Sequence, residues 1–388
     1  MAAPEARIRI LFLMRGRPGV FGGGKRAFMQ LMAALPNAQF DVFASCALDA
    51  GQHARLRGSG VAVCERNFAC ESPAGGIAAL RRYLLKERIG IVHSQGPRAD
   101  LYARVAAALA GDIALVNTVA MTTDELAMSA PRRLLYVGSD RLTRGAVRAF
   151  VAVSQAVRER LCRRGGIAPE RVVCIPNGVD VGAYGADARA RERIRHEFGF
   201  GPEVRVIGAL GRLDRRKGVE VLVDAAAALS RERSNVRVLI VGTGPVEAAC
   251  RERAARAGLG PRCVFAGFRE DVAAVLDAMD VFVMPSFAEG HPFAVLEAMA
   301  SARAIVASDI PGIREQLAHG AAGRLVPPGD AGALARGIAE LLDDPAEAAR
   351  LGGAARARAE ADFDVRQQVA QHAELYAILK GLRAGGAG

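Results

Sequence analysis

Two glutamates and two basic residues stand where they could bind a phosphorylated sugar. Glu289 follows an apolar run at residues 281–284, and Glu297 comes eight positions later. Carboxylate oxygens accept strong hydrogen bonds, so the pair suits the hydroxyl groups of a sugar or a ribose. Arg212 and Lys217 lie in a loop between another apolar run and an expected helix, where cations attract a diphosphate.

A purely structural interpretation of the glutamates is also open. Ser286 and Glu289 have the spacing of a capping box, which would leave Glu297 on a helix surface. A helix from residue 287 would carry Gly290 and Pro292 in its opening turns, however. Since proline suits a first helical turn, we expect the helix to begin near Pro292 and Glu289 to lie in the preceding loop.

A glycine loop near the N-terminus is a second candidate phosphate site. Gly22, Gly23 and Gly24 follow a strand and precede a helix, so backbone N–H groups there can approach an anion. Residues 19–25 match G-x-x-x-x-G-K, but Arg26 replaces the serine or threonine that binds magnesium. The loop therefore favours a phosphate or sugar contact, or a tight turn, over a P-loop NTPase. Residues 241–245 (VGTGP) lack the third glycine of a dinucleotide site and predict a structural turn.

Strands and helices alternate along the chain in two series, which is typical of parallel α/β sheets. A charged, turn-rich connection with irregular structure is expected at residues 176–200, and a last helix near residues 365–382. Ligands of such doubly wound sheets bind beyond the carboxyl ends of the strands. The expected strands are residues 8–14, 40–43, 61–64, 89–93, 113–117, 150–153 and 172–175, then 204–210, 236–241, 263–266, 281–284 and 304–307.

Length and composition exclude several classes of protein. A chain of 388 residues favours two domains, and 51% hydrophobic with 24% charged residues is typical of a globular protein. Stretches without charge are too short to span a bilayer, and the first residues do not resemble a signal peptide, so we expect a cytoplasmic protein. Seven scattered cysteines without a C-x-x-C pair argue against a zinc site or a disulfide framework.

The positive charge is confined to the first half of the chain. Residues 1–190 hold 26 Lys and Arg against 15 Asp and Glu, whereas residues 191–388 hold 26 of each. Nucleic acid, a phosphorylated acceptor and an anionic membrane would all suit such a surface, and an arginine-rich composition would also produce it. Arginines and apolar residues interleave over residues 132–150, which predicts either a basic amphipathic surface or an ordinary solvated helix face.

Four motifs together resemble the retaining family 4 glycosyltransferases, which have the GT-B fold. They are E-x7-E at Glu289 and Glu297 within E-G-x-P-x-x-x-L-E-A-M-A, G-R-L-x-x-x-K-G at residues 211–218, I-P-N-G-V-D at 175–180, and V-G-T-G-P at 241–245. The resemblance implies two Rossmann-like α/β domains that face a central cleft. Residues 1–180, completed by a helix at 365–388, would bind the acceptor, and residues 181–364 would bind the nucleotide sugar.

The resemblance also implies roles for individual residues. Arg212 and Lys217 would neutralise the donor diphosphate, Glu289 would bind the donor sugar, and these three are the expected catalytic residues. Glu297 would bind the ribose, and no metal or other cofactor would be needed because cations and helix N-termini replace the metal. The expected donor-binding residues are Gly23, Arg212, Lys217, Phe268, Arg269, Glu289, His291, Pro292, Phe293 and Glu297, with the backbone near Phe268 and Arg269 meeting the base.

Departures from the family pattern predict an atypical donor-sugar pocket. The usual T-x-H ends in Ala120, the usual H-x-H reads His93-Ser94-Gln95, and His291 replaces an aromatic residue. His93 lies at an apolar strand end, where a core histidine is the ordinary interpretation, so no catalytic histidine is expected. Ala302 and Ala304 replace a G-x-P pattern, which concerns packing.

The expected function is transfer of a sugar from a UDP- or GDP-linked donor to a glycan or lipid-linked acceptor, in lipopolysaccharide or other surface-polysaccharide synthesis. Peripheral binding to the cytoplasmic face of the inner membrane would explain the confined charge. Another GT-B enzyme, such as a sugar-nucleotide epimerase, is the nearest alternative. A basic nucleic-acid-binding protein is disfavoured, since Trp is absent and no recognition motif is present.

Overall fold

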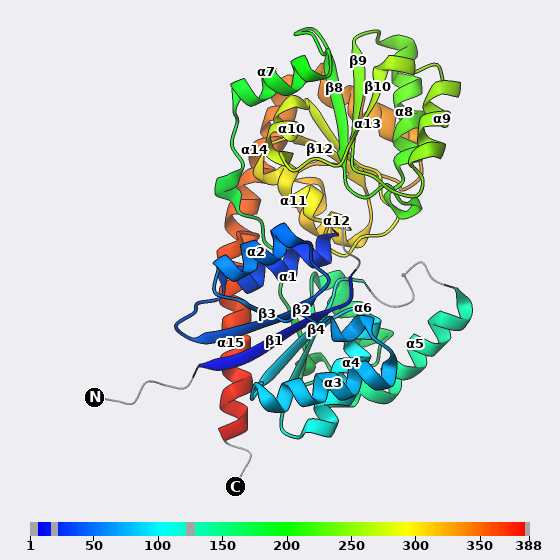
Figure 1. Cartoon of the computed structure of the whole chain (residues 1–388). Coiled ribbons are helices and arrows are strands. Elements are labelled where there is room, and N and C mark those ends of the chain that lie inside the picture. Colours follow the sequence, from blue (N-terminus) through cyan, green and yellow to red (C-terminus); the bar gives the residue numbers. More distant parts are fainter. Residues whose placement is uncertain (1–6, 17–21, 122–128, 385–388) are drawn as a thin grey trace. The chain divides into compact units, whose positions relative to one another are not determined.

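The chain forms two compact α/β units (Figure 1). The computed structural model describes residues 7–16, 22–121 and 129–384. The first unit comprises the chain up to Pro176 and the residues from Arg366 onward. The second unit is Asn177–Val365. The described residues build one parallel sheet in each unit, and helices alternate with its strands. Both sheets are doubly wound, so the predicted fold class is confirmed.

In the described part of the first unit, seven strands pair in the order β3-β2-β1-β4-β5-β6-β7. The strands are β1 (Ile8–Met14), β2 (Phe40–Cys46), β3 (Ala62–Val63), β4 (Ile91–Gln95), β5 (Ala114–Val119), β6 (Ala149–Ala152) and β7 (Val172–Cys174). The helices are α1 (Gly23–Ala34), α2 (Ala50–Gly58), α3 (Pro73–Lys86), α4 (Pro97–Ala110), α5 (Ala130–Thr143), α6 (Gln155–Arg163) and α15 (Val365–Ala384).

In the second unit, six strands pair in the order β10-β9-β8-β11-β12-β13. The strands are β8 (Arg205–Leu210), β9 (Val236–Val241), β10 (Cys263–Gly267), β11 (Val281–Met284), β12 (Ala304–Ser308) and β13 (Arg324–Val326). The helices are α7 (Ala188–Glu197), α8 (Val219–Glu232), α9 (Glu247–Arg256), α10 (Val272–Ala278), α11 (Phe293–Ala300), α12 (Pro311–Gln316), α13 (Ala331–Asp343) and α14 (Pro345–Asp362).

The central strands are apolar because helices cover both faces of each sheet. Every residue of β11 and β12 is buried, and so are five of the seven residues of β1. Helices begin where the sequence supplies a start signal. Pro292 precedes α11, and the carboxylates of Asp330 and Asp344 accept hydrogen bonds from the first turns of α13 and α14.

Two elements of the second unit differ from the prediction. The predicted irregular connection contains the helix α7, whose arginines bond to polar groups instead of forming an apolar stripe. Arg191, for example, donates to Asp280 Oδ1 at 2.7 Å. The edge strand β13 was not predicted, because it has only three residues and begins with the exposed Arg324.

The two units divide a few residues before the predicted boundary at residue 180. Val179 lies in the second unit, where its N–H donates to Phe363 O at 2.8 Å. Its carbonyl accepts from Val365 N at 3.0 Å. These backbone bonds place the end of the I-P-N-G-V-D motif with the second unit.

The basic stretch at residues 132–150 divides into a surface helix and a buried strand. Val147 and Phe150 are in the core. On α5, in contrast, Leu134, Leu135 and Leu142 are 75%, 66% and 87% exposed. The amphipathic surface is therefore limited to α5, and these leucines do not cover a core. Within the described ranges, no helix has the length and apolarity needed to cross a membrane.

Candidate functional site

Two loops of the second unit meet at the carboxyl ends of the neighbouring strands β8 and β11. Residues 211–218 follow β8 and residues 285–292 follow β11. The strand order reverses between these strands, and ligands of doubly wound sheets bind at such a switch point. The backbone N–H of Phe287 donates to Arg216 O at 2.7 Å, which ties the loops together.

The predicted residues Lys217 and Glu289 form an ion pair across these loops. Lys217 Nζ lies 2.6 Å from Glu289 Oε1, and the two side chains are 21% and 11% exposed. Ser286 Oγ donates to the same carboxylate oxygen at 3.1 Å. Ser286 therefore orients Glu289 within the loop, and the helix of this segment begins at Phe293, as predicted.

Arg212 lies in the loop after β8 and is exposed. No hydrogen bond or ion pair joins its guanidinium to another residue of the described chain. An arginine in this state can form a bidentate contact with a phosphate without first breaking a bond to protein.

Close backbone packing holds the loops in place. Gly218 has φ +61°, and a Cβ there would lie 2.1 Å from Pro285 O. Gly242 has φ +127°, and a Cβ there would lie 1.9 Å from Gly211 O. Both positions require glycine. The V-G-T-G-P motif thus packs its backbone against the loop after β8, in agreement with its structural interpretation.

Glu297 lies inside α11 and is only 4% exposed. Its Oε1 accepts a hydrogen bond from the Tyr184 hydroxyl at 2.8 Å. Asn177, in the I-P-N-G-V-D motif, donates from Nδ2 to His291 O at 2.8 Å. This motif and the residues just after it therefore position both parts of the E-x7-E segment.

The His291 ring is buried within the second unit. The side chain is buried, packs edge-on against Phe363 at 4.9 Å between centroids, and lies 3.4 Å from Gln316 Nε2. Burial lowers the pKa of His291 to about 3, so the ring is neutral. Pro292 and Phe293 are buried as well. The expected donor contacts of His291, Pro292 and Phe293 stay predictions.

Family models match both units of the chain. The model described as "Glycosyltransferase Family 4" matches residues 21–183, and the one described as "Glycosyl transferases group 1" matches residues 204–344. The phosphatidyl-myo-inositol mannosyltransferase of Mycolicibacterium smegmatis is 31% identical over 72% of this chain and 68% of its own length. The chain belongs to the family 4, group 1 glycosyltransferases, of the GT-B type. The predicted family is thereby confirmed.

Other members of the family align over different lengths. The UDP-Gal:alpha-D-GlcNAc-diphosphoundecaprenol alpha-1,3-galactosyltransferase of Escherichia coli is 25% identical over 84% of this chain and 86% of its own. The 2-deoxystreptamine glucosyltransferase of Streptomyces kanamyceticus is 34% identical over 46% of this chain, which spans about half (47%) of that relative. The crystal structure of Anabaena HepE with UDP and glucose has a TM-score of 0.83, 22% identity, and coverage of 96% of this chain and 100% of its own. This structural likeness shows the GT-B fold.

The other residues that the sequence predicted for donor binding lie after β10 in the second unit and at α1 in the first unit. Phe268 is 60% exposed, directly after β10. The Arg269 guanidinium is held by Asp271, at 2.8 Å from Nε, and by Glu197. The Arg269 side chain is thus already bonded to these two carboxylates. Contact between the nucleotide base and the backbone near Phe268 and Arg269 stays a prediction. Gly23 begins α1 in the other unit and is exposed.

Two other sequence interpretations concern the first unit of this family 4 chain. His93 is fully buried, and its ring nitrogens lie 2.6 Å from Tyr376 Oη and 2.7 Å from Thr118 Oγ1. It is a core histidine, as the sequence suggested. The G-x-x-x-x-G-K interpretation depends on Gly19, which lies outside the described residues.

Sequence reasoning missed Tyr184, Ser286 and Asn177 as members of the site. The notable signal for Asn177 was its place in a recognised motif. Ser286 was noted only for its capping-box spacing to Glu289. Tyr184 carried little signal, because a hydroxyl group becomes a site residue only when the fold brings it to a carboxylate.

Proposed function

We propose that the chain is a retaining glycosyltransferase that moves a sugar from a UDP- or GDP-linked donor to a hydroxyl group of an acceptor. The observation that carries the proposal is the Lys217–Glu289 ion pair beside the unpaired Arg212, at the carboxyl ends of β8 and β11. This arrangement offers cations for a diphosphate and a carboxylate for sugar hydroxyls. UDP and glucose are present in the Anabaena HepE structure, and the Escherichia coli relative is named for UDP-Gal, which supports a nucleotide-sugar donor.

Transfer would proceed on one face of the donor sugar. The bond between the anomeric carbon and the diphosphate oxygen breaks, and the acceptor oxygen bonds to the same face of that carbon. The acceptor proton passes to the departing phosphate. Negative charge grows on the diphosphate during this step, so Arg212 and Lys217 stabilise the transition state more than the ground state. No metal or cofactor takes part in this proposal.

Donor recognition is divided between the two glutamates. Glu289, already held by Lys217 and Ser286, would accept hydrogen bonds from the donor sugar. Glu297 would accept hydrogen bonds from the ribose and share them with Tyr184. The buried position of Glu297 supports this role, since hydrogen bonds strengthen where water is excluded.

The acceptor is proposed to be lipid-linked or a glycan of a surface polysaccharide such as lipopolysaccharide. The names of the relatives support this class, since they include a diphosphoundecaprenol substrate and phosphatidyl-myo-inositol. The helix α5 gives independent support. It combines three exposed leucines with the exposed Arg133 and with Arg141, which suits adsorption to an anionic membrane surface.

Donor binding and transfer are tested with variants of one loop. We expect Arg212→Ala and Lys217→Ala each to lower turnover by roughly 100-fold, as removal of one charge-stabilising donor does in other enzymes. Arg215→Ala is the matched control, because it removes an exposed cation three positions from Arg212 and should leave turnover within about twofold. Turnover near the parent value in both Arg212→Ala and Lys217→Ala would refute the site.

The donor and the stereochemistry need separate measurements. Thermal shift with UDP, GDP and ADP identifies the base, since a ligand at about 100 times its Kd stabilises by about 2.7 kcal/mol. Proton NMR of the first product formed reports the anomeric configuration. An inverted product would exclude the retaining mechanism, and release of a free altered sugar without acceptor would favour an epimerase.

Membrane binding is tested by flotation with vesicles of phosphatidylglycerol and phosphatidylcholine. Replacing Leu134, Leu135 and Leu142 by Ser should abolish flotation at low salt. Leu109→Ser is the control, since Leu109 is 59% exposed but lies on α4. Equal flotation of both variants would rule out α5 as the contact.

A further inference from the structure

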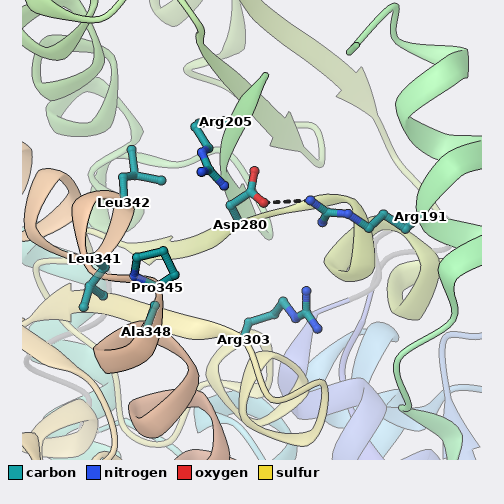
Figure 2. Close-up of a pocket in the computed structure, with 8 residues that line it drawn as sticks. All are labelled: Arg191, Arg205, Asp280, Arg303, Leu341, Leu342, Pro345 and Ala348. Atoms are coloured by element: carbon teal, nitrogen blue, oxygen red, sulfur yellow. Dashed lines mark hydrogen bonds and ion pairs between the residues drawn. The ribbon is translucent and has the colours of Figure 1, made fainter. Parts of the chain in front are cut away.

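A cavity of about 240 Å³ lies at the amino ends of the second sheet (Figure 2). Arg205 is the first residue of β8, Asp280 directly precedes β11, and Arg303 directly precedes β12. The loops with Arg212 and Glu289 leave the opposite ends of β8 and β11. The cavity is therefore distinct from the proposed donor site.

The cavity has one polar and one apolar side. Figure 2 shows Arg191, Arg205 and Arg303 around Asp280, with Pro345 and Ala348 on the other side. The apolar side is formed by the end of α13 and the beginning of α14. Such a cavity suits a ligand with an anionic group and a less polar body.

The charges that line the cavity do not balance. Three arginines against Asp280 leave an excess of about two positive charges. Behind them, Arg195 and Asp277 add one charge of each sign and leave the excess unchanged. Asp280 already serves several donors, since it accepts from Arg191 at 2.7 Å, from Val206 N at 2.7 Å and from Arg195 at 3.5 Å.

Two of the arginines are poorly compensated. No hydrogen bond or ion pair joins the Arg205 guanidinium to any other residue of the described segments. Arg303 lies 3.9 Å from Asp277 and spends its donors on the carbonyls of Ser301 and Met279. Burial, with Arg191 nearby, lowers the pKa of Arg303. A bound anion would relieve this crowding of like charges.

Acidic residues near the cavity have other partners. Asp343 is the last residue of α13 and is paired with Arg233 at 2.6 Å. Asp344 accepts from the N–H of Glu347 and caps α14, and Asp187 caps α7 in the same way. None of the three lines the cavity.

We propose that this cavity binds a small phosphate monoester whose body is a ring or an apolar group. A phosphate monoester carries about −1.5 to −2 charges at pH 7, which matches the excess of two. Guanidinium groups bind phosphate oxygens through paired N–H donors, and Arg205 has its donors available. The body of the ligand packs against Pro345 and Ala348.

The test uses isothermal titration calorimetry with phenyl phosphate and inorganic phosphate. The protein is the full chain with Arg212→Ala and Lys217→Ala, so that the proposed donor site does not contribute. We expect saturable 1:1 binding of phenyl phosphate that is tighter than binding of inorganic phosphate. Adding Arg205→Ala should weaken it by about tenfold or more, the scale of a lost hydrogen bond between charged groups.

Two further variants make the test specific. Arg231→Ala removes an exposed arginine of α8 away from the cavity and should leave the affinity unchanged. Ala348→Glu adds a carboxylate and volume opposite the arginines and should abolish binding without touching any arginine. Circular dichroism checks that each variant is folded. Absence of phenyl phosphate binding would overturn the proposal. So would an affinity in the Arg205→Ala and Ala348→Glu proteins that equals the affinity before these substitutions.

Discussion

Neutralising Glu289 should strengthen the binding of UDP while it abolishes sugar transfer. In the structure, Lys217 is not free to meet a diphosphate, because its ammonium lies 2.6 Å from Glu289 Oε1. UDP lacks the sugar that Glu289 is proposed to hold, so Glu289→Gln loses no contact with this ligand. The substitution releases Lys217 and also removes a negative charge beside the diphosphate. Glutamine can still accept the hydrogen bond from Ser286.

The magnitude follows from the geometry of the pair. At 2.6 Å and an effective dielectric constant of about 20, the gross Coulomb attraction is about 6 kcal/mol. Desolvation offsets most of it, and the side chains are 21% and 11% exposed, so the net strength is about 1 kcal/mol. Recovering this energy should tighten UDP binding by about fivefold, while turnover with the sugar donor falls by roughly 100-fold or more.

Calorimetry on four proteins tests this reasoning. The parent chain, Glu289→Gln, Lys217→Met and the double variant form a double-mutant cycle. We expect Glu289→Gln to tighten UDP binding only where Lys217 is present. Weaker UDP binding in Glu289→Gln, or the same gain in the Lys217→Met background, would show that the ion pair does not compete with the diphosphate.

Three other substitutions test the support of the site. Gly218→Ala should lower the free energy of unfolding by about 2 kcal/mol or more in urea titrations, given its φ of +61° and its crowded Cβ position, whereas Gly201→Ala has open space and should change it little. Tyr184→Phe removes the hydroxyl that donates to the buried Glu297, so we expect a loss of about 1–2 kcal/mol in stability together with weaker UDP binding by calorimetry. Burial lowers the pKa of His372 to about 4, so this group's contribution is complete above pH 6.5 and is lost as pH falls toward 4. Urea titrations at pH 7 and 4.5 should therefore show a smaller stability difference in His372→Gln than in the parent, and an equal difference would contradict the burial argument.

The sequence predicted the strands well because buried parallel strands are continuous apolar runs. Residues 281–284 and 236–241, for example, coincide with β11 and β9. An apolar run does not predict the part of a strand whose buried residues are polar. The predicted strand ended at His93, whereas β4 continues through the polar residues Ser94 and Gln95. His93 bonds to Tyr376 and Thr118, and Ser94 donates to Asp100, so these polar side chains are buried with partners.

The candidate site was predictable where a loop sequence itself requires a special backbone or charge. Arg212, Lys217 and Glu289 lie in loops between an apolar strand and a helix, and the structure brings Lys217 and Glu289 together. His291 shows the limit of this reasoning. Its place two residues after Glu289 suggested a ligand contact, but its ring packs against Phe363, and side-chain direction depends on packing that no local pattern encodes.

The second sheet places the two proposed anion sites at opposite ends of its strands. At the carboxyl ends, where the strand order reverses, the loops after β8 and β11 meet, and Lys217 of one loop pairs with Glu289 of the other. At the amino ends, arginines gather because α7 packs through Arg191 and Arg195 onto Asp280, and Arg205 and Arg303 are left without a close carboxylate partner. Six residues of β8 separate the two sites, about 20 Å at 3.3 Å per residue. Direct Coulomb coupling over that distance is screened at physiological salt, so occupancy of one site should leave the affinity of the other unchanged unless the strands themselves move.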